Sequence, residues 1–117
     1  MNSILHIVPR DHWERAKRTG VYRSDTLDTG GFIHCSAPEQ VIPVANAIFR
    51  GQTGLALLCI DPEKVRAPIR WEAPEPGGTR YPHIYGPLNT DAVVQVLAFE
   101  PGTDGTFALP EAIAGLP

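Results

Sequence analysis

Three of the four histidines in the chain lie inside short apolar segments, where strongly polar side chains are uncommon. His6 lies in LHIV, His34 in FIHC and His83 in PHIY. Imidazole can donate a proton, accept one or change charge near neutral pH, so several imidazoles on one sheet would suit acid–base chemistry. We therefore take His6, His34 and His83 as the candidate catalytic residues. His12 is expected on the exposed side of a helix, without a special role.

A structural role is the alternative for each of these histidines. An isolated histidine in a strand is usually hydrogen-bonded within the protein, because an unpaired buried polar group costs on the order of 1–3 kcal/mol. Three imidazoles could also form an open zinc site. Their intervals along the chain match no ligand pattern, so no metal is expected.

The alternation of side chains along a strand indicates which neighbours share a face with each ring. In a regular strand over residues 3–8, His6 shares a face with Ile4 and Val8, and we expect one face to be core and the other partly so. In FIHCS, His34 should point away from Cys35, which disfavours a Cys–His nucleophilic pair. Both cysteines of the chain lie in apolar runs, and we expect buried, inert thiols.

Aromatic rings surround the third histidine. In YPHIYG, His83 should share a face with Tyr81 and Tyr85, which suits a planar ligand but also describes an ordinary amphipathic strand. Glu72 ends a predicted strand just before the PEPGGT turn, and its carboxylate faces either a cleft or solvent, of which solvent is the favoured alternative. The candidate substrate-binding residues are polar side chains near these strands, namely Tyr22, Ser36, Glu72 and Tyr85.

Two helices are predicted in the first half of the chain. Asp11 and Glu14 have capping-box spacing, and Gly20 stands where a glycine would end a helix of about two turns. Residues 36–39 also have capping-box spacing, and the apolar residues after them recur at helical intervals up to Arg50-Gly51. Pro43 requires this second helix to begin late, within a turn of the proline. Residues 21–31 lack periodicity and are predicted to form a loop, of which 21–23 could be extended.

Strands dominate the second half. The apolar run 55–60 predicts a central strand, and segments 69–73 and 81–85 predict an antiparallel pair joined by a turn. Residues 92–100 predict a closing strand, and the tail after residue 110 either forms a last helical turn or frays. This order predicts an α+β class, in one domain over residues 1–117.

Composition limits the class of protein further. At 117 residues with a formal net charge of -3 and no run of like charge longer than two, the chain lacks the footprint of a protein that binds duplex nucleic acid or a membrane surface. No apolar segment is long enough to span a bilayer and no signal peptide is visible, so the expected location is the cytoplasm. The Gly30-Gly31 pair precedes a predicted strand, whereas a phosphate-binding loop follows one.

Five segments resemble a bacterial family known as domain of unknown function nine hundred and fifty-two. They are HIVPRDHW (6–13), GFIHCS (31–36), PEQVIPVAN (38–46), LLCID (57–61) and YPHIYGPLNTDAV (81–93). They extend over nearly the whole chain, and GFIHCS with PHIYGPL is a specific combination. The resemblance implies an ADP-ribosyltransferase-like fold, which is a small split antiparallel sheet with two early helices and a cleft that holds NAD in the active relatives.

The resemblance also implies roles for particular residues. In active relatives of this fold, a histidine on the first strand orients a ribose, a residue after the helix holds nicotinamide, and a late carboxylate supports the positively charged ribose. His6 and His34 match the first two positions. At the late position the chain has His83, Tyr85 and Gly86 in place of a glutamate, which argues against a conventional protein-modifying transferase. A phosphate-handling site, as in the RNA 2′-phosphotransferase branch, is an alternative, although its basic residues are not recognisable here.

The hypothesis from sequence is therefore a transferase or hydrolase that uses NAD or a related nucleotide as its substrate. His6 would hold a ribose hydroxyl, His34 the base or its amide, and His83 would act in acid–base or electrostatic catalysis, with Tyr85 as a stacking wall. The rival hypothesis is a nucleotide-binding module that keeps the cleft and lacks the chemistry. A small nucleotide is the expected partner in both cases.

Overall fold

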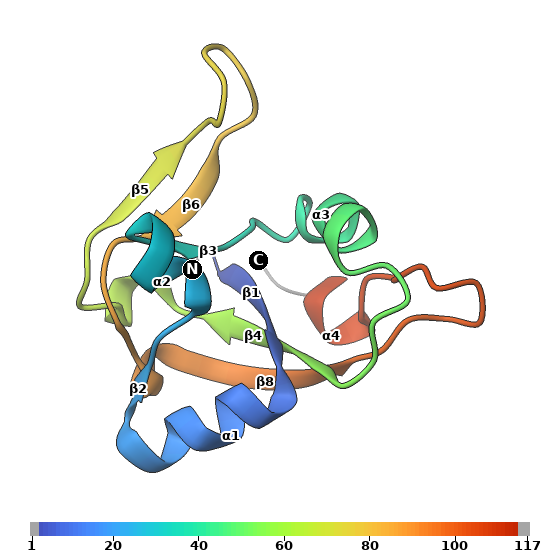
Figure 1. Cartoon of the computed structure of the whole chain (residues 1–117), viewed down its shortest axis with the longest axis horizontal. Coiled ribbons are helices and arrows are strands. Elements are labelled where there is room, and N and C mark those ends of the chain that lie inside the picture. The colour runs from blue at the N-terminus through green and yellow to red at the C-terminus, as the bar shows by residue number, and fades with distance from the viewer. Residues whose placement is uncertain (1–2, 115–117) are drawn as a thin grey trace.

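The central sheet contains three antiparallel strands in the order β1–β4–β8 (Figure 1). Its strands, in a computed structural model that describes residues 3–114, are β1 (Ile4–Pro9), β4 (Leu55–Ile60) and β8 (Val93–Phe99). Every residue of β4 is buried, as the middle strand of a sheet covered on both faces requires. The predicted central strand is confirmed.

Alternate residues of the central strands enter two separate cores. Ile4 and Val8 belong to a cluster that also contains Trp13 of the first helix, while Leu5 and Ile7 belong to a cluster on the opposite face. Because side chains alternate along β1, His6 lies on the same face of the strand as Ile4 and Val8, as predicted. The face of β1 that was expected to be only partly core is as fully buried as the other, because the sheet is covered on both faces.

A second sheet supplies the other half of the cleft described below. Its order is β3–β6–β5, with β3 at Ile33–His34, β6 at Tyr81–Ile84 and β5 at Ile69–Glu72. The predicted antiparallel pairing of the last two strands is confirmed, and their hairpin projects from the rest of the protein in Figure 1. An isolated bridge between Leu5 and Ser36 connects this sheet to β1.

A third, two-stranded sheet pairs β2 (Val21–Tyr22) with β7 (Leu88–Asn89). The extended conformation considered for 21–23 is therefore present at its first two residues. β7 was not expected, because a two-residue strand has no periodicity to read. Pairing with β7 places Tyr22 against the core, where it is only 3% exposed.

The two predicted helices are present with different caps. α1 (Arg10–Thr19) ends at Gly20 in a left-handed conformation, as predicted, but begins after Pro9 without a side-chain cap. α3 (Val41–Ile48) begins two residues before Pro43, which fits the expected late start. The predicted cap at Ser36 is wrong, because the backbone of Ser36 pairs with Leu5 instead.

The predicted loop over 21–31 contains an additional short helix, α2 (Asp25–Gly30). The hydroxyl of Ser24 accepts a hydrogen bond from the Leu27 amide, and Gly31 ends the helix in a left-handed conformation. These capping signals were visible in the sequence, but the helix has too few turns for an apolar period. The remaining elements are two 3₁₀ turns and a last helix, namely η1 (Pro62–Lys64), η2 (Thr90–Ala92) and α4 (Glu111–Ala114).

The structure is thus a mixed α+β fold with three small antiparallel sheets, and the predicted α+β class is confirmed. Residues 115–117 of the predicted tail lie outside the described residues. Within the described part of the chain, no helix has both the length and the apolar character to cross a membrane.

The hydrophobic cluster that contains Ile4, Val8 and Trp13 depends on side chains that are completely buried. We expect Leu58→Ala to lower the free energy of unfolding by about 2–5 kcal/mol, because Leu58 is fully buried beside Trp13 and Tyr22 in the same cluster. The matched control is Leu109→Ala, which removes the same atoms from a side chain that is 39% exposed. Urea unfolding measures both, and equal losses in the two variants would contradict this description of the core.

Candidate functional site

A cleft of about 950 Å³ lies between β1, α2, α3 and the β5–β6 hairpin. All four histidines of the chain line it, although they come from four different elements or segments. The three candidate catalytic residues are therefore on one cleft, and His12 of α1 joins them. The candidate substrate-binding residues that also line it are Tyr22, Ser36 and Glu72.

His6 is held at the back of this cleft by hydrogen bonds from both ring nitrogens. Nδ1 lies 2.6 Å from the carbonyl oxygen of His34, and Nε2 lies 2.8 Å from the hydroxyl of Tyr22. A carbonyl can only accept, so Nδ1 carries the proton, and Nε2 of the neutral ring must accept from the Tyr22 hydroxyl. The hydrogen bonds thus define the tautomer, and neither nitrogen is free for a ribose hydroxyl.

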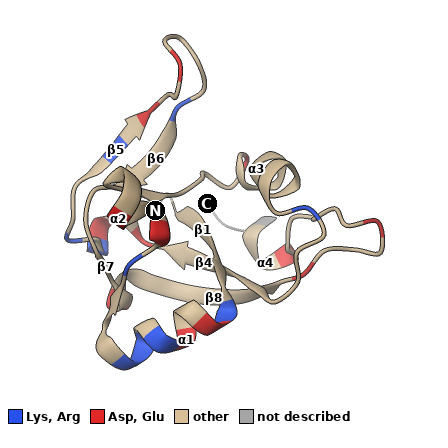
Figure 2. Ribbon diagram, in the orientation of Figure 1, with Lys and Arg blue, Asp and Glu red and all other residues tan. Residues whose placement is uncertain are grey.

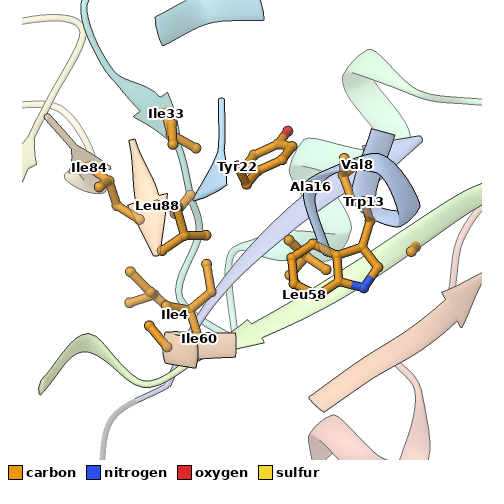
Figure 3. Close-up of a cluster of buried hydrophobic side chains, with 13 residues drawn as sticks. Ile4, Val8, Trp13, Ala16, Tyr22, Ile33, Leu58, Ile60, Ile84 and Leu88 are labelled. Atoms are coloured by element: carbon orange, nitrogen blue, oxygen red, sulfur yellow. The ribbon is translucent and has the colours of Figure 1, made fainter. Parts of the chain in front are cut away.

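Burial keeps this pair uncharged. Desolvation lowers the pKa of His6 from 6.5 to about 4, against the opposing effect of the His34 carbonyl, so the ring is neutral at pH 7. Burial also raises the pKa of Tyr22, whose ring packs among the core side chains in Figure 3. Since the Tyr22 proton is directed at His6, the phenol oxygen can only accept a hydrogen bond from a group in the cleft.

A carboxylate orients the third candidate histidine. Nδ1 of His83 lies 2.9 Å from Oε1 of Glu72, and the Tyr85 hydroxyl donates to the same oxygen. These two hydrogen bonds, with the Tyr85 contribution first, lower the pKa of Glu72, so it is ionised at neutral pH. Because the carboxylate accepts, Nδ1 of His83 is the protonated nitrogen.

The remaining nitrogen of His83 is therefore the atom available for chemistry. Nε2 has no hydrogen-bond partner among the described residues, and it is not among their buried unpaired atoms, of which Ser3 Oγ is the only one. The ring is held flat by Phe32, which stacks on it at 4.1 Å between centroids and 19° between planes. His83 is a buried residue that lines the cleft, and one ring nitrogen oriented by a carboxylate with the other left unpaired is the arrangement that a general base requires.

His34 is the exposed member of the group. It lies directly opposite His83 in the sheet, with its ring edge-on at 5.3 Å, and it also contacts Phe32 edge-on at 4.7 Å. Partial burial, then the nearby His83, lower the pKa of His34. Its ring is therefore a neutral hydrogen-bonding group at the mouth of the cleft.

The opposite wall is apolar. It consists of α3 side chains and the end of that helix, namely Pro43, Val44, Ala47, Ile48 and Phe49. Ile48 is 69% exposed, which is unusual for a large aliphatic side chain on a helix. A ligand in this cleft would meet imidazoles and a carboxylate on one side and an aliphatic surface on the other.

Three features of the site differ from what the sequence suggested. His12 lines the cleft, because α1 follows directly on β1 and its first turn stays beside that strand. Tyr85 does not line it: its hydroxyl is bonded to Glu72 and the Arg70 guanidinium lies 4.9 Å from its ring centroid. Tyr85 is thus a support for Glu72 in this structure. Glu72 faces the cleft, although solvent was the favoured alternative for its side chain.

The cysteines do not provide a nucleophile at neutral pH. Burial raises the pKa of Cys35 and raises that of Cys59 to about 11, and both thiols are free. Cys35 is buried in the core while His34 is exposed, as the strand alternation predicted. No three His, Cys, Asp or Glu side chains within residues 3–114 are grouped to hold a metal ion.

These features define a small α+β protein with a histidine-lined cleft between two antiparallel sheets. The chain belongs to the family described as protein of unknown function (DUF952), whose model matches residues 7–96. The family resemblance seen in the sequence is therefore confirmed.

Solved structures of one bacterial protein share this fold. The crystal structure of CC0527 from Caulobacter crescentus is 36% identical to this chain, with a TM-score of 0.86 over 96% of this chain and 98% of that chain. A crystal structure of a double mutant of that protein has a TM-score of 0.85, at the same identity and coverage. The solution NMR structure of CC0527, at 36% sequence identity to this chain, has a TM-score of 0.75. That match covers 99% of this chain and 97% of CC0527. No curated protein matches the chain.

The burial of neutral His6 predicts a pH dependence of stability. The pKa of His6 is lower in the folded than in the unfolded protein, so the unfolded chain binds the additional proton between pH 6.5 and about 4. The stabilisation is therefore present above pH 6.5 and is lost as the pH falls towards 4, by roughly 3 kcal/mol.

The measurement is urea unfolding of the wild type and His6→Gln at several pH values. The free-energy difference between them should shrink as the pH falls through this window. His34→Gln serves as the comparison, because the pKa of His34 is shifted in the same direction but the His34 ring is exposed. The difference in unfolding free energy between wild type and His34→Gln should therefore change less over the same pH range. A constant difference between wild type and His6→Gln from pH 7 to pH 4 would show that His6 is not buried in its neutral form.

Proposed function

We propose that this cleft binds NAD or a related nucleotide and cleaves its N-glycosidic bond, with transfer of the ribosyl group to water or another acceptor. The observation that carries the proposal is the convergence of His6, His34 and His83 from distant parts of the chain on one cleft, with a carboxylate bonded to one of them. Residues that meet only through folding, and that include an oriented histidine, are what a catalytic site needs.

Glu72 has the chemistry of the late carboxylate that the ADP-ribosyltransferase-like fold uses. Glu72 lies on β5 and not at the later chain position where active relatives of that fold have a glutamate. Chain order alone therefore did not identify it as the matching residue. Its Oε1 accepts from His83 and Tyr85, and its Oε2 has no hydrogen-bond partner among the described residues. An ionised oxygen facing the cleft would stabilise the positive charge that develops on the ribose as the glycosidic bond breaks.

His83 would serve as the general base. In hydrolysis, the bond between C1′ of the ribose and the ring nitrogen breaks, and its electron pair neutralises the pyridinium. A water molecule adds to C1′ and gives a proton to Nε2 of His83, whose other nitrogen stays bonded to Glu72. The products are nicotinamide, the ribosyl product and a proton released to solvent.

The other residues would position the substrate. His34, exposed and neutral, would hydrogen-bond the base or its amide. The ribose hydroxyl assigned to His6 would instead be held by Tyr22, because both ring nitrogens of His6 are bonded within the protein. His6 is thereby a positioning residue that fixes the direction of the Tyr22 proton and leaves its oxygen as an acceptor.

A binding module without catalysis is the second candidate. It is favoured by the engagement of His6 and of one Glu72 oxygen within the protein, since such networks also occur as purely structural supports. In that case the same cleft and the same ligand would be retained, without the bond cleavage.

The test is incubation of the purified protein with NAD, followed by chromatography for nicotinamide. We expect turnover in the wild type and a loss of at least about 100-fold in kcat for His83→Asn, with a much smaller change in KM. Glu72→Gln should also reduce kcat, whereas Glu39→Gln, an exposed carboxylate outside the cleft lining, should leave it unchanged.

Thermal unfolding of each variant separates a catalytic effect from misfolding. Binding of NAD without nicotinamide release in the wild type would select the binding module. The absence of both binding and release with NAD and with nicotinamide riboside would overturn the proposed function.

A further inference from the structure

The charge of the cleft lining limits the kind of nucleotide that it can hold. Among the lining residues that the structure describes there is no Lys or Arg, while two carboxylates, Asp25 and Glu72, are present. Figure 2 shows the ribbon of α3 without charged colours along its length and an acidic segment on α2. His6 is neutral at pH 7, and the pKa of His34 is lowered. The lining therefore offers no permanent positive charge.

The two helix N-termini beside the cleft are poorly suited to replace the missing cations. A phosphate is commonly held by Arg or Lys side chains or by the free amides at a helix N-terminus. The first turn of α2 carries Asp25 and Asp28, and the hydroxyl of Ser24 already caps the Leu27 amide. In α3, the first turn contains Pro43, which has no amide hydrogen.

The neighbouring hollow at the tip of the β5–β6 hairpin does not supply the charge either. It has a volume of about 610 Å³ and contains Arg80, but Glu72 and Glu75 also line it. Carboxylates therefore outnumber guanidinium groups there as well. A phosphate placed in either hollow would meet anionic side chains.

The same features suit a positively charged aromatic ring. Glu72 is ionised, and Phe32, His83 and Tyr81 place ring faces or edges along one wall. A cation against aromatic rings and a carboxylate is attracted by both. The aliphatic surface of α3 would cover the opposite face of a planar ligand.

From this lining we infer that the substrate class is a phosphate-free pyridinium riboside, or the corresponding half of a larger molecule whose phosphates stay outside the cleft. The inference rests on the proposed function and narrows it, since NAD would then be a poorer ligand than its nicotinamide riboside part. Cleavage neutralises the pyridinium ring, so the departing base would lose its attraction to Glu72.

The test compares three ligands that differ in charge. Calorimetric titration of wild-type protein and of His83→Asn, which lacks the proposed base, would use nicotinamide riboside, its 1,4-dihydro form and nicotinamide mononucleotide. The dihydro form removes the ring charge at nearly constant shape, and the mononucleotide adds one phosphate.

We expect nicotinamide riboside to bind at least tenfold more tightly than the mononucleotide at low salt, and the difference to decrease at high salt. It should also bind about tenfold more tightly than its dihydro form, and Glu72→Gln should remove that preference. Asp25→Asn should weaken the discrimination against the mononucleotide. Asp28→Asn is the matched control, because Asp28 is on the same helix, pairs with Arg23 and does not line the cleft.

The outcomes separate this inference from the proposed function. Equal or tighter binding of the mononucleotide or of NAD would overturn the inference and leave the proposed function standing. Failure of all three ligands and of NAD to bind would overturn both.

Discussion

The ring of His6, on the central sheet, hydrogen-bonds to residues of both other sheets, and the arrangement of the cleft depends on these two contacts. Nδ1 donates to the carbonyl of His34 in the second sheet, and Nε2 accepts from Tyr22 in the third. The bond that Nε2 accepts from Tyr22 needs a neutral imidazole, which burial favours by lowering the pKa of His6. His6, which the sequence suggested as a catalytic residue, thus has a structural role, because both of its ring nitrogens are hydrogen-bonded within the protein. In the proposed function, the reactive groups are other residues of the cleft that His6 supports.

The three candidate histidines differ in the groups that contact their rings, and these contacts decide which role each can have. His6 has a carbonyl and a phenol, and no free nitrogen. Among the described residues, His83 has a carboxylate on one ring nitrogen and no hydrogen-bond partner on the other, while the His34 ring has aromatic contacts and no hydrogen bond. The same side chain therefore has a structural role at His6 and, in the proposed function, acts as the base at His83 and as a hydrogen-bonding group at His34, depending on what surrounds it. The described lining of the cleft contains no Lys or Arg, and the preference that we infer for the ligand's charge rests on the lining as a whole and not on any single residue.

The sequence predicted most of the framework and only part of the site. Apolar runs and punctuation located the central strand β4, the hairpin of β5 and β6, and both longer helices, because these elements have a clear period or a clear end. The division into three sheets was not visible, since β2, β3 and β7 have two residues each. Alternation correctly placed His34 and Cys35 on opposite sides of their strand. By contrast, the pairing of Glu72 with His83 depends on the register of the hairpin, and the contribution of His12 depends on how α1 lies against β1. Neither of these is a property of the local sequence.

The state of His6 can be observed directly by long-range ¹H–¹⁵N NMR spectra of the histidine rings over a pH series. At pH 7 we expect the His6 ring to show one protonated nitrogen, Nδ1, and one unprotonated nitrogen, Nε2, and to remain so until the pH approaches 4. A His6 ring with its proton on Nε2, or one that titrates at the ordinary histidine value, would contradict the structural role of His6 on which this description of the cleft is based.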